Sequence, residues 1–249
     1  MHRMWVRLRA SWRLVRLLAC LMQGLITQLI FFPRWTPHQR QQAVVRWNQA
    51  MIKAMGVQVE LSGRVHPGPL LVVSNHFSWL DNLVIHSQFF GRFVAKDEVR
   101  RWPIMGQLAE RAGTFFIERT SRRDAMRMVH AMADAIRRED VLIVFPEGTT
   151  NDGTRLLPFH ANLIQAAIEA QAPIQPMGVT YWSARHPGER SFAPRFFGAD
   201  TLPRSAWTTL CADGVKVHIR MGDVMHAQGR DRRQWAADLQ QAVQNLCGS

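Results

Sequence analysis

The sequence predicts an α/β fold, in which a mostly parallel or mixed sheet is flanked by helices and preceded by a membrane-associating helical hairpin. Two observations lead to this prediction. Short apolar runs alternate along most of the chain with longer segments in which apolar residues recur at helical spacing. The first 54 residues instead contain only helical patterns, one of them strongly basic. We therefore expect the hairpin over residues 1–54 and a single α/β domain over residues 55–249.

The hairpin is expected to begin with an amphipathic basic helix over residues 3–16. At about 100° per residue, the apolar side chains gather in an arc of roughly 100° and the arginines lie outside it. The apolar set is Met4, Trp5, Leu8, Trp12 and Val15, and the basic set is Arg3, Arg7, Arg9, Arg13 and Arg16. Tryptophan and arginine on different faces suit the headgroup boundary of a membrane, so we expect the helix to lie there.

The stretch that follows, residues 17–32, is apolar but is interrupted by Gln23, Gly24, Thr27 and Gln28. As a helix it would rise about 24 Å, which is less than the roughly 30 Å of a bilayer's hydrocarbon core. We expect it to dip into one leaflet or to lie on the membrane, and to end at Pro33. A second helix, from about Pro37 to Ala54, then completes the hairpin.

Composition and charge restrict the partners. Lys plus Arg is 31 against 19 for Asp plus Glu, a formal net charge of +12, and 47% of the residues are apolar. Such a chain is expected to fold and to favour anionic partners. Charge alone leaves nucleic acid, anionic membrane lipids and an acidic substrate or carrier open, and the basic amino-terminal helix favours the lipids over nucleic acid.

The cysteines indicate the compartment. Cys20, Cys211 and Cys247 are odd in number, far apart and without the spacing of metal ligands. We therefore expect neither a disulfide framework nor a metal site. This cysteine usage fits a reducing environment, so we expect the protein to face the cytoplasm. Together with the amino-terminal helix, it predicts a peripheral or monotopic protein on the cytoplasmic face of the inner membrane.

Seven strands and four further helices are expected after the hairpin. Residues 57–61 alternate between apolar and polar, as in a half-buried strand, whereas residues 70–73 are uniformly apolar, as in a buried one. The other expected strands are 92–96, 113–118, 141–145, 175–181 and 216–221. The expected helices are 79–88, 121–138, 159–170 and 231–246.

A candidate catalytic pair follows the apolar strand 70–73. His76 and Asp81 lie in the strand-to-helix turn, at the carboxyl edge of the sheet, where ligands usually bind in open α/β folds. Residues five apart on an unbroken helix point about 140° from each other and could not pair. If Asp81 opens the helix and His76 stays in the loop, the carboxylate can orient the imidazole as a general base.

Two more strands end in polar or charged residues. Residues 113–119 read Gly-Thr-Phe-Phe-Ile-Glu-Arg, and residues 145–150 read Phe-Pro-Glu-Gly-Thr-Thr. Strand ends of this kind are expected to meet along one edge of the sheet.

In the residues that follow these three strands, the sequence resembles the glycerolipid acyltransferase family typified by the 1-acyl-glycerol-3-phosphate acyltransferases. The resemblance covers residues 70–182. Its four ordered blocks match residues 75–81, 113–119, 145–149 and, more weakly, 172–179.

The resemblance implies an O-acyltransferase that needs no cofactor and forms no acyl-enzyme. The residue matching His76 deprotonates the free hydroxyl of lysophosphatidic acid, Asp81 orients the histidine, and the hydroxyl attacks a thioester of coenzyme A or of an acyl carrier protein. The product is phosphatidic acid. The implied substrate-binding residues are Arg119, Glu147, Gly148 and Thr149, with Lys96 as a further candidate for the phosphate.

One departure from the family pattern concerns the acceptor. Many members that use a phosphate-bearing acceptor have arginine after Glu-Gly-Thr, where this chain has Thr150. Arg155 could substitute, or the acceptor could be another lyso-lipid, such as a lyso-ornithine lipid.

Three other readings of these residues are a serine hydrolase, a metal site and a non-enzymatic protein. A serine hydrolase would need a G-x-S-x-G turn, which the sequence lacks. A metal site built from His76, Asp81, Glu118 and Glu147 would lack the spacing of helix-borne ligands. A non-enzymatic basic membrane-binding protein with the same fold remains open, and its function would not depend on His76.

Overall fold

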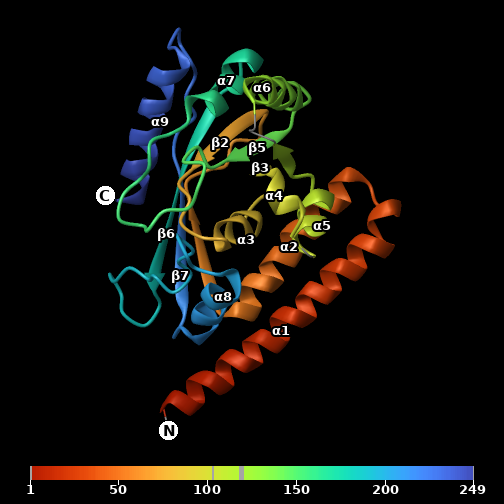
Figure 1. Cartoon of the computed structure of the whole chain (residues 1–249), viewed down its shortest axis with the longest axis vertical. Helices are drawn as coiled ribbons and strands as arrows, with labels where there is room; N and C mark the ends of the chain where they lie inside the picture. Colours follow the sequence, from red (N-terminus) through yellow and green to blue (C-terminus); the bar gives the residue numbers. More distant parts are fainter. Residues whose placement is uncertain (1, 103, 118–120, 249) are drawn as a thin grey trace.

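The computed structural model describes residues 2–102, 104–117 and 121–248 (Figure 1). Its centre is a seven-stranded sheet with the strand order β1-β7-β6-β2-β5-β3-β4. The strands are β1 (Val57–Ser62), β2 (Leu70–Ser74), β3 (Arg92–Lys96), β4 (Phe115–Ile117), β5 (Val141–Val144), β6 (Ile174–Ser183) and β7 (Val215–Met221). Neighbouring strands are parallel except β6 and β7, which are antiparallel. The prediction of a mixed sheet flanked by helices is confirmed.

Helices cover both faces of the sheet (Figure 1). They are α1 (His2–Ile30), the short 3-10 helix η1 (Phe32–Arg34), α2 (Pro37–Met55), α3 (Leu80–His86), α4 (Asp97–Arg100), α5 (Met105–Arg111), α6 (Arg122–Arg137), α7 (Ala161–Ala170), α8 (Leu202–Cys211) and α9 (Arg232–Cys247). One hydrophobic core lies under α2, α3 and α8, and a second lies under α6, α7 and α9. The uniformly apolar β2 is buried on both faces because it contributes side chains to both cores.

Every strand and helix that the sequence predicts is present, with ends that differ from the predicted ones by a few residues. Three helices were not predicted. These are α4, α5 and α8, of four, seven and ten residues. Such short segments give too few turns for helical periodicity to stand out. The omission matters because α5 lines a cavity that also includes His76, and α8 is hydrogen-bonded to the amino-terminal helix.

The amino-terminal segment is a hairpin of two long helices, as expected. The stretches 3–16 and 17–32 were predicted separately, but α1 continues without a break from the first into the second and ends at Ile30. Thr36 begins α2 with a capping box, in which its side chain accepts from the Gln39 backbone and the Gln39 side chain accepts in return. Gly56 ends α2 with a φ of 73°, and a Cβ there would collide with the guanidinium of Arg13. Glycine therefore suits the junction of α2 and β1, because other residues rarely adopt this φ and a Cβ would displace the Arg13 side chain.

The outer face of α1 is an exposed apolar stripe. Its side chains are between 46% and 65% exposed, and the stripe runs the length of the helix: Met4, Trp5, Leu8, Trp12, Val15, Leu18, Met22, Ile26, Leu29, Ile30 and Phe31. The polar interruptions Gln23, Thr27 and Gln28 instead line cavities on the side facing α2. By length and composition, Arg3–Ile30 is the one helix among the described residues that could cross a membrane. An apolar face turned away from the body suggests that α1 associates with a membrane.

Two arginines of the basic set do not face outward. Arg9 pairs with Asp213 at 2.5 Å and donates to the carbonyl of Cys211, while Arg13 donates to the carbonyls of Leu210 and Ala212 at 2.8 Å. The last carbonyls of a helix lack partners within it and carry partial negative charge, so the end of α8 attracts the two cations. Arg9 and Arg13 thus bind the body of the protein, which the amphipathic pattern of residues 3–16 did not indicate.

Candidate active site

His76 and Asp81 form a hydrogen-bonded pair in the turn between β2 and α3. The imidazole Nδ1 lies 2.8 Å from Asp81 Oδ2. Asp81 is in the first turn of α3 and is fully buried, whereas the His76 side chain is 19% exposed. This is the arrangement that the five-residue spacing required. Because an ionised carboxylate can only accept, Nδ1 carries the proton and Nε2 is the acceptor.

Asp81 is held by three further donors. Oδ2 also accepts from the backbone N–H groups of Phe77 and Ser78, at 2.8 and 2.9 Å. Oδ1 accepts from the hydroxyl of Tyr181 at 2.5 Å. Burial and the neighbouring Asp81 carboxylate raise the pKa of Tyr181 well above its usual value, so the phenol keeps the proton that it donates. Tyr181 is on β6 and was not predicted as part of the site.

Glu147 is hydrogen-bonded to the loop that carries His76. Its Oε1 accepts from the His76 backbone N–H at 2.7 Å, and its Oε2 accepts from Asn151 Nδ2 at 2.6 Å and from the Leu157 backbone at 2.8 Å. Burial raises the pKa of Glu147, and these hydrogen bonds oppose the rise. Both oxygens thus bind the protein, which places Glu147 as a support for the His76 loop.

The loop is also attached to its neighbouring strand. The Asn75 side chain exchanges hydrogen bonds with the Val179 backbone on β6, with its Nδ2 2.9 Å from the carbonyl and its Oδ1 2.8 Å from the N–H. The His76 ring stacks on Phe145 with centroids 4.0 Å apart. The imidazole is therefore held by the hydrogen bond of Nδ1 to Asp81 and by the stack on Phe145, and its loop is held by Glu147 and Asn75.

His76 opens onto a cavity of about 390 Å³ between α2, α3, α5 and the end of β3. Exposed polar residues lie at the strand ends, among them Lys96 and Thr149, with Gly148 and Thr150 beside them. The lining also includes buried apolar side chains, among them Val44, Leu83, Phe93 and Leu108, and the buried amides of Gln28 and Asn48. The cavity thus has exposed polar residues at the strand ends and a largely apolar lining.

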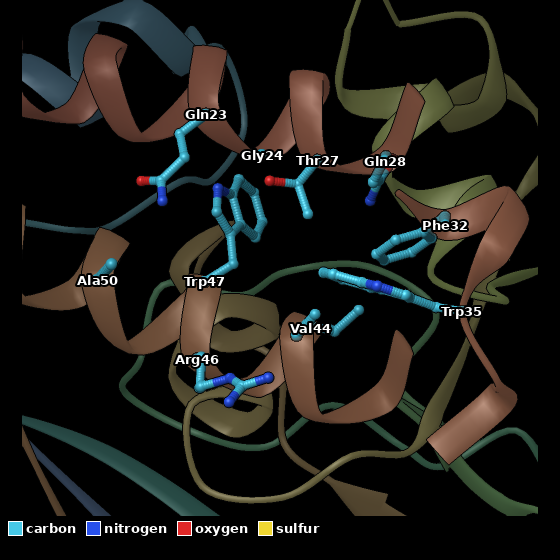
Figure 2. A pocket seen from close by; sticks show the side chains of 11 residues that line it. Gln23, Gly24, Thr27, Gln28, Phe32, Trp35, Val44, Arg46, Trp47 and Ala50 are labelled. Atoms are coloured by element: carbon cyan, nitrogen blue, oxygen red, sulfur yellow. The ribbon is translucent and has the colours of Figure 1, made fainter. Parts of the chain in front are cut away.

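A second cavity of about 280 Å³ lies between α1 and α2 (Figure 2). Gln28, Val44 and Trp47 line both cavities, so the two adjoin. The Trp47 indole donates to the Cys20 carbonyl at 2.7 Å, and a Cβ at Gly24 would collide with it. Glycine in α1 therefore permits the close approach of the two helices.

Of the other residues predicted for the site, three line the cavity that contains His76. Lys96, Gly148 and Thr149 line the cavity with His76, whereas Arg119 and Glu118 fall outside the described residues. Arg155 is exposed and lines a different hollow of about 70 Å³ with Arg190. Arg155 is therefore not part of the lining of the cavity that contains His76.

A second histidine in the cavity wall was not foreseen. His86 ends α3, is 7% exposed, and lies 2.7 Å through Nε2 from the Gly91 carbonyl. Burial lowers the pKa of His86 to about 4, so the ring is neutral near pH 7 and Nε2 donates to the carbonyl. With that nitrogen used for structure, His76 is the better-placed base.

The described residues contain no group of three or more His, Cys, Asp or Glu side chains that could hold a metal ion. Cys20, Cys211 and Cys247 are free thiols.

Comparisons with known proteins find acyltransferases among the similar sequences. A family model described as acyltransferase matches residues 56–180. A lyso-ornithine lipid O-acyltransferase of Pseudomonas aeruginosa is 36% identical over 204 residues, which cover 82% of this chain and 78% of the relative. A 1-acyl-sn-glycerol-3-phosphate acyltransferase of Neisseria meningitidis serogroup B is 33% identical over 186 residues, covering 74% and 71%.

A solved structure shares the fold. The 1-acyl-sn-glycerophosphate acyltransferase PlsC of Thermotoga maritima superposes with a TM-score of 0.69 at 17% identity, over 100% of this chain and 99% of that one.

Proposed function

This chain belongs to the acyltransferase family, and we propose that it transfers a fatty acyl group from a thioester to the free hydroxyl of lysophosphatidic acid. The observation that carries the proposal is the His76–Asp81 pair, at 2.8 Å, beside a largely apolar cavity. An oriented base beside a hydrocarbon-sized space suits a reaction between a hydroxyl and a fatty acyl thioester.

In the proposed reaction, His76 Nε2 accepts the proton of the acceptor hydroxyl as its oxygen attacks the thioester carbonyl. A C–O bond forms, the C–S bond breaks, and the leaving thiolate takes up the proton from the imidazolium. Asp81 stabilises the imidazolium while it exists, and Tyr181 and two backbone N–H groups hold Asp81 in place. The thiol belongs to coenzyme A or to an acyl carrier protein, both of which are acidic and suit the positive chain. No metal or cofactor takes part.

The exposed polar residues at the strand ends support an anionic acceptor. Lys96 is exposed there, and Gly148 and Thr149 contribute small groups that leave room beside it. We propose that these residues, together with Arg119, contact the headgroup. The role of Glu147 in substrate binding is indirect in this proposal, because both of its oxygens bind the catalytic loop and its neighbours.

A lyso-ornithine lipid is the second candidate acceptor, favoured by the name of the Pseudomonas relative and by Thr150. We expect wild type to have the higher kcat/KM for lysophosphatidic acid. Thr150 lines the cavity, so Thr150→Arg adds a charge-assisted contact and should raise that kcat/KM by about one to two powers of ten.

The matched control is Thr154→Arg, which adds the same charge in the hollow that contains Arg155. It should leave the ratio of kcat/KM for the two acceptors unchanged. Steady-state kinetics of the three proteins with both lipids measure the effect. A wild type that prefers the lyso-ornithine lipid overturns our choice of acceptor.

We propose that α1 lies on the cytoplasmic face of the inner membrane and holds the enzyme there as a peripheral or monotopic protein beside anionic lipids. The support is the exposed apolar stripe, together with the polar residues turned inward. The three cysteines are odd in number and far apart in the sequence, which favours a reducing compartment.

Trp5→Glu combined with Trp12→Glu should release the protein from vesicles that contain phosphatidylglycerol. The two indoles are 65% and 64% exposed, so the change removes lipid contact and little internal packing. Burying each side chain contributes about 1.5–3 kcal/mol, so the partition coefficient should fall about a hundredfold or more.

The matched control is Met126→Glu on α6, which is 58% exposed on the other side of the sheet and should leave binding unchanged. Vesicle sedimentation measures both. These substitutions are sharper than deletion of residues 1–32, which would also remove the bonds of Arg9 and Arg13 to α8. Unchanged sedimentation of the double variant would show that α1 is not the anchor.

A further inference from the structure

A small hollow beside the loop of His76 is lined by two arginines. Its volume is about 70 Å³, and Arg155 and Arg190 both line it. Asn75 and Phe77, the neighbours of His76 in the chain, line it as well, whereas His76 itself lines the larger cavity. No described residue lines both spaces. The hollow and the cavity therefore open on different sides of the loop that carries His76.

Neither arginine of the hollow pairs with a carboxylate among the residues that the structure describes. Arg190 Nη2 donates to the Cys247 carbonyl at 2.8 Å, and the guanidinium lies over the Trp182 ring, 4.3 Å from its centroid. The other N–H groups of this guanidinium remain for a ligand. Arg155 is exposed and has no hydrogen bond to the described part of the chain. Burial lowers the pKa of Arg190 and the charge of Arg220 lowers it too, so an anion would be favourable here.

The loop that carries Arg155 keeps its single carboxylate out of the hollow. Asp152 accepts from the backbone N–H and the hydroxyl of Thr154, at 2.9 and 2.6 Å, and it is not part of the lining. No other aspartate or glutamate lines the hollow within the described ranges. Gly153, with a φ of 82°, lets the loop pack on Phe77, because a Cβ would lie 2.6 Å from that ring. The hollow is thus lined by cations without acidic groups.

The size and the lining of the hollow restrict its ligand. One water needs about 10–15 Å³, so a space of about 70 Å³ holds a phosphate-sized group but no fatty acyl chain. Arginine binds phosphate through charge-assisted, often paired hydrogen bonds. Phe77, Leu156 and Phe192 also line the hollow, so carbon atoms next to the phosphate would find apolar contacts. A phosphate ester on a partly apolar chain suits both parts of the lining.

Two phosphates belong to the substrates of the proposed reaction, and their reach differs. In lysophosphatidic acid about four bonds join the free hydroxyl to the phosphorus, a span of about 5 Å. A hydroxyl at His76 Nε2 therefore keeps its phosphate in the cavity that Lys96 also lines. The phosphopantetheine arm, which coenzyme A and acyl carrier proteins share, has about thirteen bonds from sulfur to phosphorus and spans about 15 Å when extended. The longer arm is the one that can pass around the loop to the hollow.

We propose that Arg155 and Arg190 bind the phosphate of the phosphopantetheine arm of the acyl donor. The inference rests on the proposed function, because it places the donor of the same acyl transfer. The phosphate is a recognition group, and no bond to phosphorus forms or breaks. Since both donor classes carry this arm, the same two arginines serve coenzyme A thioesters and acyl carrier proteins.

The first test compares two donors that differ only in the phosphate, acyl-phosphopantetheine and acyl-pantetheine with the same acyl chain. Wild-type kcat/KM should be about ten to a hundred times higher with the phosphate, as charge-assisted hydrogen bonds allow. A second readout needs no turnover. Isothermal titration calorimetry of the protein in detergent micelles should give tighter binding of phosphopantetheine than of pantetheine by a similar factor.

The second test uses Arg155→Gln, at an exposed position without internal hydrogen bonds. The ratio of kcat/KM for the phosphorylated and plain donors should fall about tenfold, through a higher KM for the phosphorylated donor. The matched control is Arg138→Gln, which removes an exposed arginine between α6 and the start of β5, at the opposite edge of the sheet. It should keep the wild-type ratio. Arg190→Gln should lower the ratio as well, but it also removes a bond to the end of α9.

The outcomes separate the two proposals. A wild type that uses both donors equally well overturns this inference and leaves the acyltransferase proposal intact. If Arg155→Gln keeps the donor ratio, the inference fails as well, and a higher KM for lysophosphatidic acid would then assign the hollow to the acceptor phosphate. A wild type that acylates neither lyso-lipid with any donor contradicts the proposed function itself. In that case calorimetry still decides whether the hollow binds phosphopantetheine, since equal binding of the two arms by wild type would overturn it.

Discussion

His76→Ala lowers turnover by about 10²- to 10⁴-fold and leaves the protein folded. A hydroxyl is a weak nucleophile near neutral pH, and a positioned base contributes about that factor. The side chain is partly exposed at the mouth of the cavity, so its removal leaves no large void in either core. Because the base acts in the chemical step, kcat should fall with little change in KM. Steady-state kinetics and circular dichroism measure the two parts of the prediction.

His130→Ala is the matched control. His130 is exposed on α6 and pairs with Glu169, on the face of the sheet opposite the cavity. It should keep wild-type turnover. Near-normal turnover of folded His76→Ala would rule out the proposed base and would favour a non-enzymatic role for this fold or a different catalytic group.

Substituting Asp81 should affect both activity and stability, and the two effects should separate between variants. Asp81→Asn keeps the shape but removes the charge that orients the imidazole and stabilises the imidazolium, so turnover should fall at least about a hundredfold. Asp81→Ala should be equally inactive and should also lower the free energy of unfolding by about 2–5 kcal/mol. It leaves two backbone N–H groups and the Tyr181 hydroxyl buried without an acceptor.

Kinetics and urea unfolding in detergent micelles measure these effects. Asp134→Asn and Asp134→Ala, at an exposed position on α6, are the matched controls and should change neither quantity. If Asp81→Ala unfolds at the same urea concentration as wild type, the network around the carboxylate does not stabilise the fold as the geometry indicates. Retained turnover in Asp81→Asn would show that the imidazole needs no anionic partner.

Local sequence was sufficient for much of the fold. The apolar run of β2 predicts a strand buried on both faces, because only such a strand needs no polar side. The spacing of His76 and Asp81 predicts a turn between them, because an unbroken helix would point them apart. The amphipathic pattern at residues 3–16 predicts an exposed apolar face, which the structure has. The division of the chain at residues 54 and 55, and the roles of the site residues, stay predictions.

Local patterns were thus enough to place the periodic elements, the turn that holds His76 and Asp81, and the polar ends of three strands. Which distant groups meet them followed from the packing of strands and helices. Tyr181 reaches Asp81, and Asn75 reaches Val179, because β6 pairs with β2 about a hundred residues away. Arg155 faces a hollow apart from His76, and Gln28 turns inward from a helix whose outer face is apolar. Periodicity reports which side of an element is buried, but strand order and helix docking depend on contacts between segments that are remote in sequence, and no local pattern encodes those contacts.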